Sequence, residues 1–331
     1  MSETSLQNPT YRPSEEDKAA LKAALGELLQ EHVILAKHTS FRIGGPADFF
    51  ARLSREEEML RALQCCYARR IPLLVIGNGS NMLLSDLGWR GLVVLNRMAE
   101  LSLTEVANGE ALVKIGSGAL LGKVARRLAK EGWAGFECAA TIPGSIGGGV
   151  VSNAGAHGSE FAKVLTRVGV VTATGECRVM LPEELGLTYR HSRWRTHIGM
   201  DKAPIGGEGN ELILWAEFRL QRGLPNEIKR AIDAQTAWRR EKQPQEPSGG
   251  STFKNPVGRS VDRSAGQLIE EAGLKGFCIG KAQFSLRHAN FIVNLGDAKS
   301  TEVLALIHLA QKTVQEKFGI ELELEIELLG E

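Results

Sequence analysis

The sequence has few cysteines, almost no net charge and no long apolar run. Its five cysteines form no CxxC pair and no Cys/His spacing, which disfavours a structural metal site and a disulfide framework. A formal net charge of +1 provides no basic field for nucleic acid. No apolar run reaches the roughly 18 residues of a membrane span, and the N-terminus lacks an apolar signal region. We therefore expect reduced thiols in a cytoplasmic protein, with no metal, nucleic acid or membrane insertion.

What the chain does have is length and a globular composition. It contains 331 residues, 43% of them hydrophobic and 24% charged, which favours two or three domains. We predict a disordered tail over residues 1–13 and a domain boundary at Gly223–Pro225. This boundary divides the chain after the tail into a domain over 14–222 and a last domain over 223–331.

Hydrophobic periodicity predicts the elements of these domains. Ser14 is expected to cap a helix over residues 15–30, and residues 111–132 fit a strand, a glycine turn and a helix. Short strands dominate residues 164–220. Further strands are predicted at 72–77, 91–96, 290–296 and 320–330, and further helices at 226–243, 264–273 and 300–318.

A glycine-rich stretch, "TIPGSIGGGVVSNAGAHG", runs from Thr141 to Gly158. Six of its 18 residues are glycine and none is lysine or arginine. Backbone N–H groups can hold a diphosphate without a lysine, whereas a P-loop for a triphosphate needs the sequence GK[ST]. The stretch therefore favours a dinucleotide diphosphate. Glycines that merely allow a helix and a sheet to pack closely remain the alternative.

Two further glycine segments are less specific. "GNGSN" (Gly77–Asn81) directly follows an apolar strand, and its N–H groups are able to form an anion-binding concavity. An ordinary tight turn explains it equally well. "GSGALLG" (Gly116–Gly122) differs by one residue from the dinucleotide fingerprint and lacks the acid expected downstream.

Three polar segments are candidates for chemistry. In "PSGGSTFKNP", Ser251 does not match the GxSxG pattern of a hydrolase nucleophile, which leaves proton donation or a simple turn. "YRHSRWR" (Tyr189–Arg195) has three arginines that suit a carboxylate or phosphate, or a solvated loop. The closing strand places Glu321, Glu323, Glu325 and Glu327 on one face, and the alternation selects none of them.

Taken together, these segments resemble the UDP-N-acetylenolpyruvoylglucosamine reductases, flavoenzymes of peptidoglycan precursor synthesis. The similar segments follow the family's order and span about nine-tenths of the chain. They are "HTSFRIGGPAD" (His38–Asp48), "PLLVIGNGSNMLLSD" (Pro72–Asp86), "GFECAATIPGSIGGGVVSNAGAHGSE" (Gly135–Glu160), "YRHSRWR", "KQPQEPSGGSTFKNP" (Lys242–Pro256), "AGLKGFCIGKAQFSLRHANFIVN" (Ala272–Asn294) and the closing strand.

The resemblance implies an α+β protein. Its FAD-binding domain, over 14–222, would have two α/β subdomains that meet near residue 88, of the type shared with vanillyl-alcohol oxidase and p-cresol methylhydroxylase. Its C-terminal α+β domain, over 223–331, would bind the substrate. FAD would be bound tightly but not covalently, with NADPH as co-substrate. NADPH would reduce the flavin, whose N5 then passes hydride to UDP-N-acetylglucosamine enolpyruvate; protonation of the resulting carbanion gives UDP-N-acetylmuramate. We expect a monomer, although the small net charge permits a dimer as well.

The resemblance also assigns residues. Ser251 resembles the general acid, Arg190 the residue that polarises the substrate carboxylate, and Glu325 the catalytic glutamate of the ending LxxExxxxG. A neighbouring cation such as Lys254 would depress the pKa of Ser251. The residues expected at the cofactor are Arg42, Gly77, Asn78, Gly79, Ser80, Asn81, Ile142, Pro143, Gly144, Ser145, Gly147, Gly148 and Asn153, and those expected at the substrate are Tyr189, Lys242, Lys254 and Asn255.

Departures and alternatives accompany this resemblance. Residues 196–210 form a longer segment than in compact members, and the chain resembles the type without an extra tyrosine-bearing loop. One alternative is an oxidase on the same scaffold that uses oxygen. Another is a flavin-free module that binds a UDP-sugar and uses its glycines for packing only.

Overall fold

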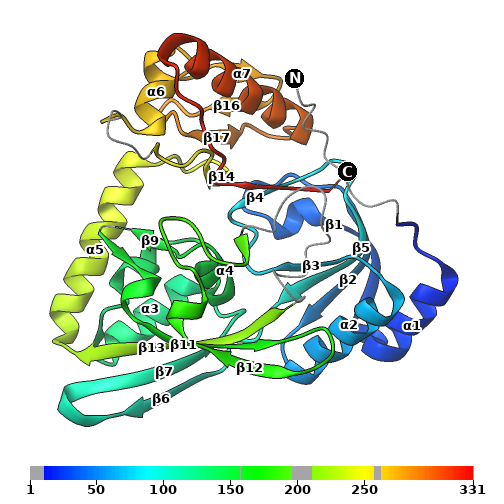
Figure 1. Ribbon diagram of the computed structural model, residues 1–331. Coiled ribbons are helices and arrows are strands. Elements are labelled where there is room, and N and C mark those ends of the chain that lie inside the picture. The colour runs from blue at the N-terminus through cyan, green and yellow to red at the C-terminus, as the bar shows by residue number, and fades with distance from the viewer. Residues whose placement is uncertain (1–10, 157, 196–210, 257–261, 331) are drawn as a thin grey trace.

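The computed structural model describes residues 11–156, 158–195, 211–256 and 262–330 (Figure 1). Most of the predicted tail and all of segment 196–210 lie outside these residues. Figure 1 shows two sheet-containing subdomains below a smaller C-terminal domain, with helix α5 joining them along one side. No helix in the described part of the chain combines the length and the apolar character needed to cross a membrane.

The first subdomain is a four-stranded sheet covered by two helices. Its strand order is β1 (Leu29–Ile34), β2 (Pro46–Leu53), β5 (Trp89–Asn96) and β3 (Leu73–Ile76), and its helices are α1 (Glu15–Leu25) and α2 (Glu56–Arg69). Ser14 caps α1 as predicted, but the helix ends at Gly26 (φ 58°) instead of residue 30. Because β5 lies between β2 and β3, the boundary between the two sheets falls after Asn96 and not near residue 88.

The second subdomain is an antiparallel sheet packed on two helices. Its order is β12 (Cys177–Met180), β11 (Leu165–Val171), β13 (Leu212–Arg222), β7 (Glu110–Gly116) and β6 (Leu101–Glu105), and β8 (Trp133–Ala134) also pairs with β13. The helices are α3 (Leu121–Lys130) and α4 (Ile146–Val151). Their apolar faces and the sheet form one core that contains Phe136, Phe161 and Phe218. The loop after α4 contains the short pair β9 (Gly155–Ala156) and β10 (Ser159–Glu160).

The C-terminal domain follows α5 (Pro225–Lys242). It has a four-stranded sheet in the order β14 (Ser248–Ser251), β17 (Phe291–Asn294), β16 (Ala282–Phe284) and β15 (Cys278–Ile279), together with α6 (Ala265–Glu271) and α7 (Ser300–Phe318). Helix α7 has the bounds predicted from the sequence, and Gly319 ends it at φ 69°. Short 3₁₀ turns complete the chain, at Gly26–Leu28, Leu35–His38, Ala107–Gly109, Glu137–Thr141, Phe161–Lys163 and Pro182–Glu184.

The end of the chain returns to the first subdomain. Only Glu327–Leu329 (β18) forms the strand predicted over 320–330, and it pairs in parallel with β4 (Met82–Leu84). The residues before it bond to the loop after β14 instead: the Glu325 N–H donates to the Thr252 carbonyl at 2.8 Å, and Leu324 bridges Phe253. This closing segment therefore brings the C-terminal domain, the turn after β3 and Glu325 to one place.

Candidate active site

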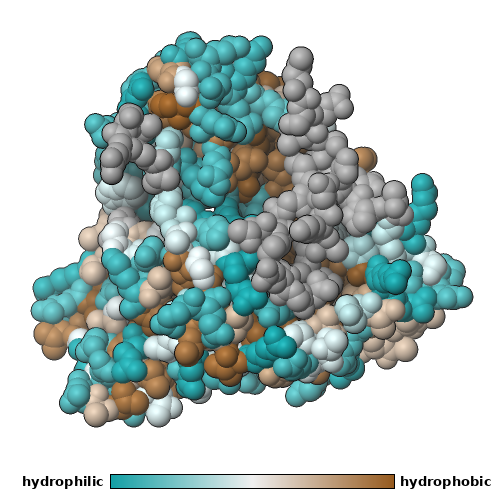
Figure 2. All heavy atoms as spheres, in the orientation of Figure 1, coloured by the Kyte–Doolittle hydropathy of each residue, from teal (hydrophilic) through white to brown (hydrophobic). Residues whose placement is uncertain are grey.

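A cavity of about 630 Å³ lies where the two subdomains meet the C-terminal domain. Figure 2 shows a hollow between the C-terminal domain above and the subdomains below. The walls come from the turn after β3, from α4 and its preceding loop, from the start of β13, and from α5, β14 and β18. Its volume falls in the range of about 300–1,000 Å³ that is typical of small-molecule sites.

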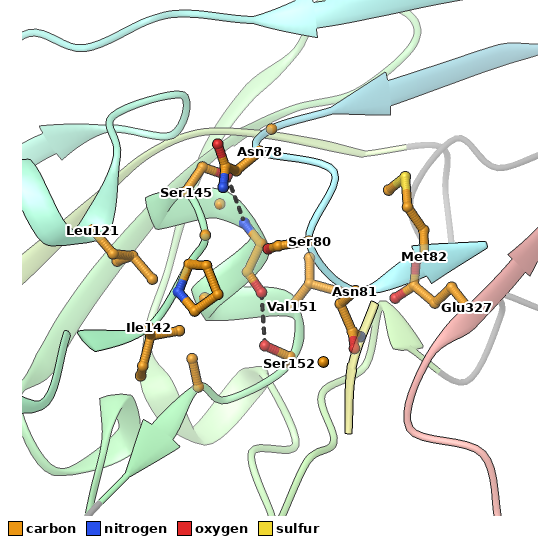
Figure 3. Close-up of a pocket in the computed structure, with 18 of the residues that line it drawn as sticks. Asn78, Ser80, Asn81, Met82, Leu121, Ile142, Ser145, Val151, Ser152 and Glu327 are labelled. Atoms are coloured by element: carbon orange, nitrogen blue, oxygen red, sulfur yellow. Dashed lines mark hydrogen bonds between the residues drawn. The ribbon is translucent and has the colours of Figure 1, made fainter. Parts of the chain in front are cut away.

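The turn Gly77–Asn81 forms one wall (Figure 3). Gly79 has φ 59°, and a Cβ there would lie 2.3 Å from the His38 carbonyl oxygen, so glycine is required. The Ser40 N–H donates to the Gly79 carbonyl at 2.9 Å, and Arg97 Nη1 donates to the Gly77 carbonyl at 2.7 Å. The carbonyls of Gly77 and Gly79 are therefore bonded to other parts of the protein. The turn is thus held rigidly at the cavity, as an anion-binding loop requires.

The facing wall is the segment Ile142–Gly149, whose glycines serve two purposes. A Cβ on Gly149 would lie 2.5 Å from the Phe161 ring, and one on Gly147 would lie 3.1 Å from Ser117 Cβ. A Cβ on Gly148 would meet nothing nearer than Ser145 Oγ at 3.5 Å, and Gly148 lines the cavity. Close packing therefore explains Gly149, whereas the absent side chain at Gly148 leaves space in the cavity.

This difference predicts two distinct outcomes for two neighbouring alanine variants. Gly148→Ala should leave the apoprotein as stable as the wild type, because alanine has room and favours a helix. It should weaken binding of FAD, the cofactor expected from the sequence, by about tenfold or more, because its methyl group occupies cavity space. Gly149→Ala should lower the melting temperature of the apoprotein itself. Melting curves and flavin-fluorescence titrations measure both effects; equal loss of apo stability in the two variants would contradict this division.

The three residues predicted to be catalytic all line the cavity. Arg190 Nε and Glu325 Oε1 lie 2.7 Å apart as an ion pair, and Arg190 Nη2 donates to the Gly155 carbonyl at 3.0 Å.

Ser251 lies at an irregularity where β14 shifts register against β17, after Gly250 with φ 85°. A Cβ on Gly250 would lie 3.7 Å from the Ser80 carbonyl oxygen. The Ser251 loop therefore adjoins the turn Gly77–Asn81.

Burial distinguishes the glutamates that the sequence pattern could not separate. Burial raises the pKa of Glu325, against the opposing effect of Arg190, Arg195 and Lys254. Burial likewise raises the pKa of Glu327, which lies beside Met82 in Figure 3. Glu323, in contrast, is exposed and pairs with Lys254. Two of the four carboxyls, Glu325 and Glu327, thus line the cavity and resist ionisation.

Arg239 is a cavity residue that the sequence analysis missed. It lies in the last turn of α5, donates to the Thr141 carbonyl and to Gln243 Oε1, and lines the cavity. Burial, together with the charge of Arg190, lowers its pKa to about 10. In the sequence, "RREK" fits the basic residues that commonly end a helix. Two partly buried guanidinium groups that repel each other favour an anionic ligand near them.

The remaining candidates fall into two groups. Asn78, Ser80, Asn81, Asn255 and the residues Ile142–Ser145 line the cavity. Those outside the cavity lining are Arg42, Asn153, Tyr189, Lys242 and Lys254.

Asn153, expected at the cofactor, is 1% exposed. Its side chain forms hydrogen bonds with Thr188, Glu160 and Ala162, so it holds the loop after α4. Lys254 and Lys242 form ion pairs with Glu323 and Glu241, and the charge of Lys254 also acts on the pKa of Glu325.

The residues fit a bound dinucleotide on structural grounds. Gly148 leaves space that a side chain would occupy, and the carbonyls of Gly77 and Gly79 are already bonded to Arg97 and Ser40. Within the described residues, no cluster of His, Cys, Asp and Glu is suited to a metal ion. FAD would be held between Gly77–Asn81 and Ile142–Gly148, with Arg190, Ser251 and Glu325 at the wall contributed from outside these two segments.

Comparisons with known proteins agree with this arrangement. Residues 47–180 match the family model for an FAD-binding domain, and residues 243–329 match that for the C-terminal domain of UDP-N-acetylenolpyruvoylglucosamine reductase. These matches confirm the predicted fold class, an FAD-binding domain followed by a second α+β domain, and FAD as the cofactor.

Full-length relatives extend the similarity to almost the whole chain. A UDP-N-acetylenolpyruvoylglucosamine reductase of Agathobacter rectalis is 42% identical over 316 residues, which cover 92% of this chain and 94% of that protein. One of Halalkalibacterium halodurans is 42% identical over 90% of this chain and 93% of its own. The crystal structure of the Thermus caldophilus enzyme superposes with a TM-score of 0.71 at 34% identity, covering 90% of this chain and 98% of that one.

Proposed function

Because the chain belongs to the UDP-N-acetylenolpyruvoylglucosamine reductase family, an FAD-dependent group of oxidoreductases, we propose that it reduces UDP-N-acetylglucosamine enolpyruvate to UDP-N-acetylmuramate at the expense of NADPH. The observation that carries this proposal is the meeting of Arg190, Ser251 and Glu325 in the cavity that also contains the FAD-binding loops. Bound FAD supplies the two-electron carrier between NADPH and the substrate's double bond.

Arg190 is proposed to bind the substrate carboxylate and to stabilise the negative charge that develops beside it. Its guanidinium is anchored through Nη2 on Gly155, it is only 24% exposed, and it already pairs with a carboxylate, Glu325. A fixed, largely desolvated cation stabilises developing charge better than one that must reorganise. Arg239 supplies a second cation for the phosphates of the substrate.

Ser251 is proposed to deliver the proton to the carbon next to the carboxylate. Its loop is fixed by the two residues that directly follow the serine: Thr252 N–H donates to the Asn290 carbonyl at 2.7 Å, and Phe253 N–H donates to Asn290 Oδ1 at 3.0 Å. A serine hydroxyl is a weak acid, so its correct position must contribute most of its effect. The closing segment bonded to Thr252 places Glu325 next to this loop as a source of a further proton.

Glu325 is proposed to act in its neutral form. If it stayed ionised, it would compete with the substrate carboxylate for Arg190. Because burial raises its pKa, the neutral form persists above the usual titration range of a glutamate, and it is lost as the pH rises through the raised value. Substrate binding should therefore weaken with increasing pH.

This gives a pH prediction with a matched variant. The KM for the UDP-sugar should increase with pH in the wild-type enzyme, whereas Glu325→Gln, which imitates the neutral acid, should give a KM that hardly changes. Arg190→Lys should keep a cation beside Glu325 and retain the wild-type direction. Steady-state kinetics at constant ionic strength measure the three profiles. A Glu325→Gln profile parallel to that of the wild type would rule out this role.

The proposed reaction is tested by its strict dependence on the substrate. NADPH oxidation by the purified holoenzyme should require the enolpyruvyl UDP-sugar and should yield a product two hydrogens heavier, which mass spectrometry identifies. Rapid NADPH oxidation with oxygen and without the UDP-sugar would indicate the oxidase instead. A protein that binds the UDP-sugar but takes up no FAD would indicate the flavin-free module.

A further inference from the structure

A buried acid that has no part in this mechanism lines the same cavity. Glu211 immediately precedes β13, and only 4% of it is exposed. Its Oε2 has no hydrogen-bond donor. Arg193 Nη2 forms an ion pair with it at 3.8 Å, which is too far for a hydrogen bond. A buried carboxylate oxygen without a hydrogen-bond donor destabilises the protein. A bound ligand that supplies the donor would remove this cost.

The position of Glu211 identifies the end of the cavity at which it acts. Leu212 and Ile213, the next residues, also line the cavity, and Leu212 packs in the apolar cluster between the two sheets. Ser251 and Glu325, by contrast, belong to the C-terminal domain and its closing segment. Figure 1 shows β13 in the lower sheet, away from the C-terminal domain. Glu211 thus lies where the cavity is bounded by the start of β13 and the apolar cluster between the subdomains.

We propose that Glu211 accepts a hydrogen bond from the adenosine of FAD and so determines the affinity for the dinucleotide. A carboxylate is purely an acceptor, and it repels the diphosphate, so its ligand must be a donor on another part of the cofactor. The adenosine offers two kinds of donor, the exocyclic amine of the base and the hydroxyls of the ribose. Glu211 lies beyond residues 47–180, which match the FAD-binding family model.

A second unpartnered group supports an adenosine site here. Trp194 also lines the cavity, is 2% exposed, and has an indole Nε1–H without a hydrogen-bond acceptor. The ring nitrogens of adenine are acceptors. A lone donor and a lone acceptor that line the same cavity match a ligand that carries both, which an apolar or purely anionic ligand does not.

The test is a set of affinities measured on apoprotein reconstituted with FAD and two analogues. One analogue has a hydrogen in place of the adenine amine, and the other lacks the ribose hydroxyls of the adenosine. The wild type should bind one of them about tenfold or more weaker than FAD, which identifies the donor. Glu211→Ala should bind FAD as weakly as that analogue and should not distinguish the two. Equal affinities of the wild type for all three would overturn the proposal.

An isosteric variant and a matched control make this test specific to Glu211. Glu211→Gln should fold, should lose at least about threefold of the discrimination, and should raise the melting temperature of the apoprotein by about 1–3 °C because a buried carboxylate oxygen without a hydrogen-bond donor is no longer charged. Glu217, 6% exposed on the same strand, is bonded to Arg167 and Thr166, so Glu217→Gln should lower that temperature and leave the discrimination intact. Unchanged discrimination in Glu211→Gln would also overturn the proposal.

The inference rests on FAD as the cofactor. Different results would contradict FAD as the cofactor and the role of Glu211. A wild-type apoprotein that binds no FAD at all would contradict both. A wild type that binds FAD but does not discriminate between it and the analogues would contradict the role of Glu211 alone, and the site formed by Arg190, Ser251 and Glu325 would stand.

Discussion

Replacing Ser251 with alanine should slow reduction of the enolpyruvyl substrate by about 10³-fold, while NADPH still reduces the bound flavin at nearly the wild-type rate. The reason is that the two half-reactions differ in their need for a proton donor. Only the second leaves a carbanion that must be protonated, and loss of a positioned general acid typically costs about 10²–10⁴-fold. Anaerobic stopped-flow absorbance separates the two rates directly.

Two further variants make the Ser251 result specific. Ser248→Ala changes a serine at the other end of β14, outside the cavity, and should leave both rates unchanged. Ser251→Cys restores an acidic proton at the same position and should recover part of the lost rate. If Ser251→Ala slows both half-reactions equally, its effect is on the structure of the site, and Ser251 is not the proton donor.

The second large effect is expected at Arg190. Arg190→Met should lower kcat/KM for the UDP-sugar by about 100- to 1,000-fold, with a much smaller effect on NADPH. The substrate carboxylate loses its partner, because the cation that lies 2.7 Å from Glu325 in the structure is the one proposed to bind it. Steady-state kinetics with each substrate varied in turn measure the change.

Conservative and remote substitutions define the role of Arg190. Arg190→Lys keeps the charge but loses the planar, two-pronged geometry, so it should recover only part of the activity. Arg178 is exposed and pairs with Glu176 on the surface, so Arg178→Met should change kcat/KM little. Equal losses for NADPH and for the UDP-sugar in Arg190→Met would mean that Arg190 supports the fold of the site and does not bind the substrate carboxylate.

The sequence predicted elements whose pattern is local. Helix α7 has the predicted bounds because an apolar face of helical period ends at Gly319, the residue that adopts φ 69°. The boundary near residue 88 was wrong for the opposite reason. Strand β5 pairs with β2 and β3, which lie earlier in the chain, and no local pattern records a pairing between distant segments.

The candidate site was predictable where a residue type and its neighbours form a distinctive segment. Ser251, Arg190 and the turn Gly77–Asn81 are of this kind, and all line the cavity. Arg239 was missed because a basic residue in the last turn of a helix has an ordinary explanation, and its burial against Thr141 is a tertiary property. Asn153 was expected at the cofactor, but nothing in its local sequence indicates that its amide is used by Thr188 and Ala162.

The glutamates of the closing segment illustrate the same limit. A period of two places Glu321, Glu323, Glu325 and Glu327 on one face, and the pattern treats them alike. Only the contacts of the folded chain separate the buried Glu325 from the exposed Glu323. Burial depends on which distant segments cover a residue, and here these are the loop after β14 and the arginines at 190 and 195.

The central claim is that one cavity joins a flavin to the enolpyruvyl UDP-sugar, and the visible spectrum of the purified protein tests it most directly. The account predicts a flavin absorption band that NADPH bleaches in the absence of air and that returns when the UDP-sugar is added. A colourless protein that cannot be loaded with FAD, or a bleached flavin that the UDP-sugar fails to reoxidise, would contradict it.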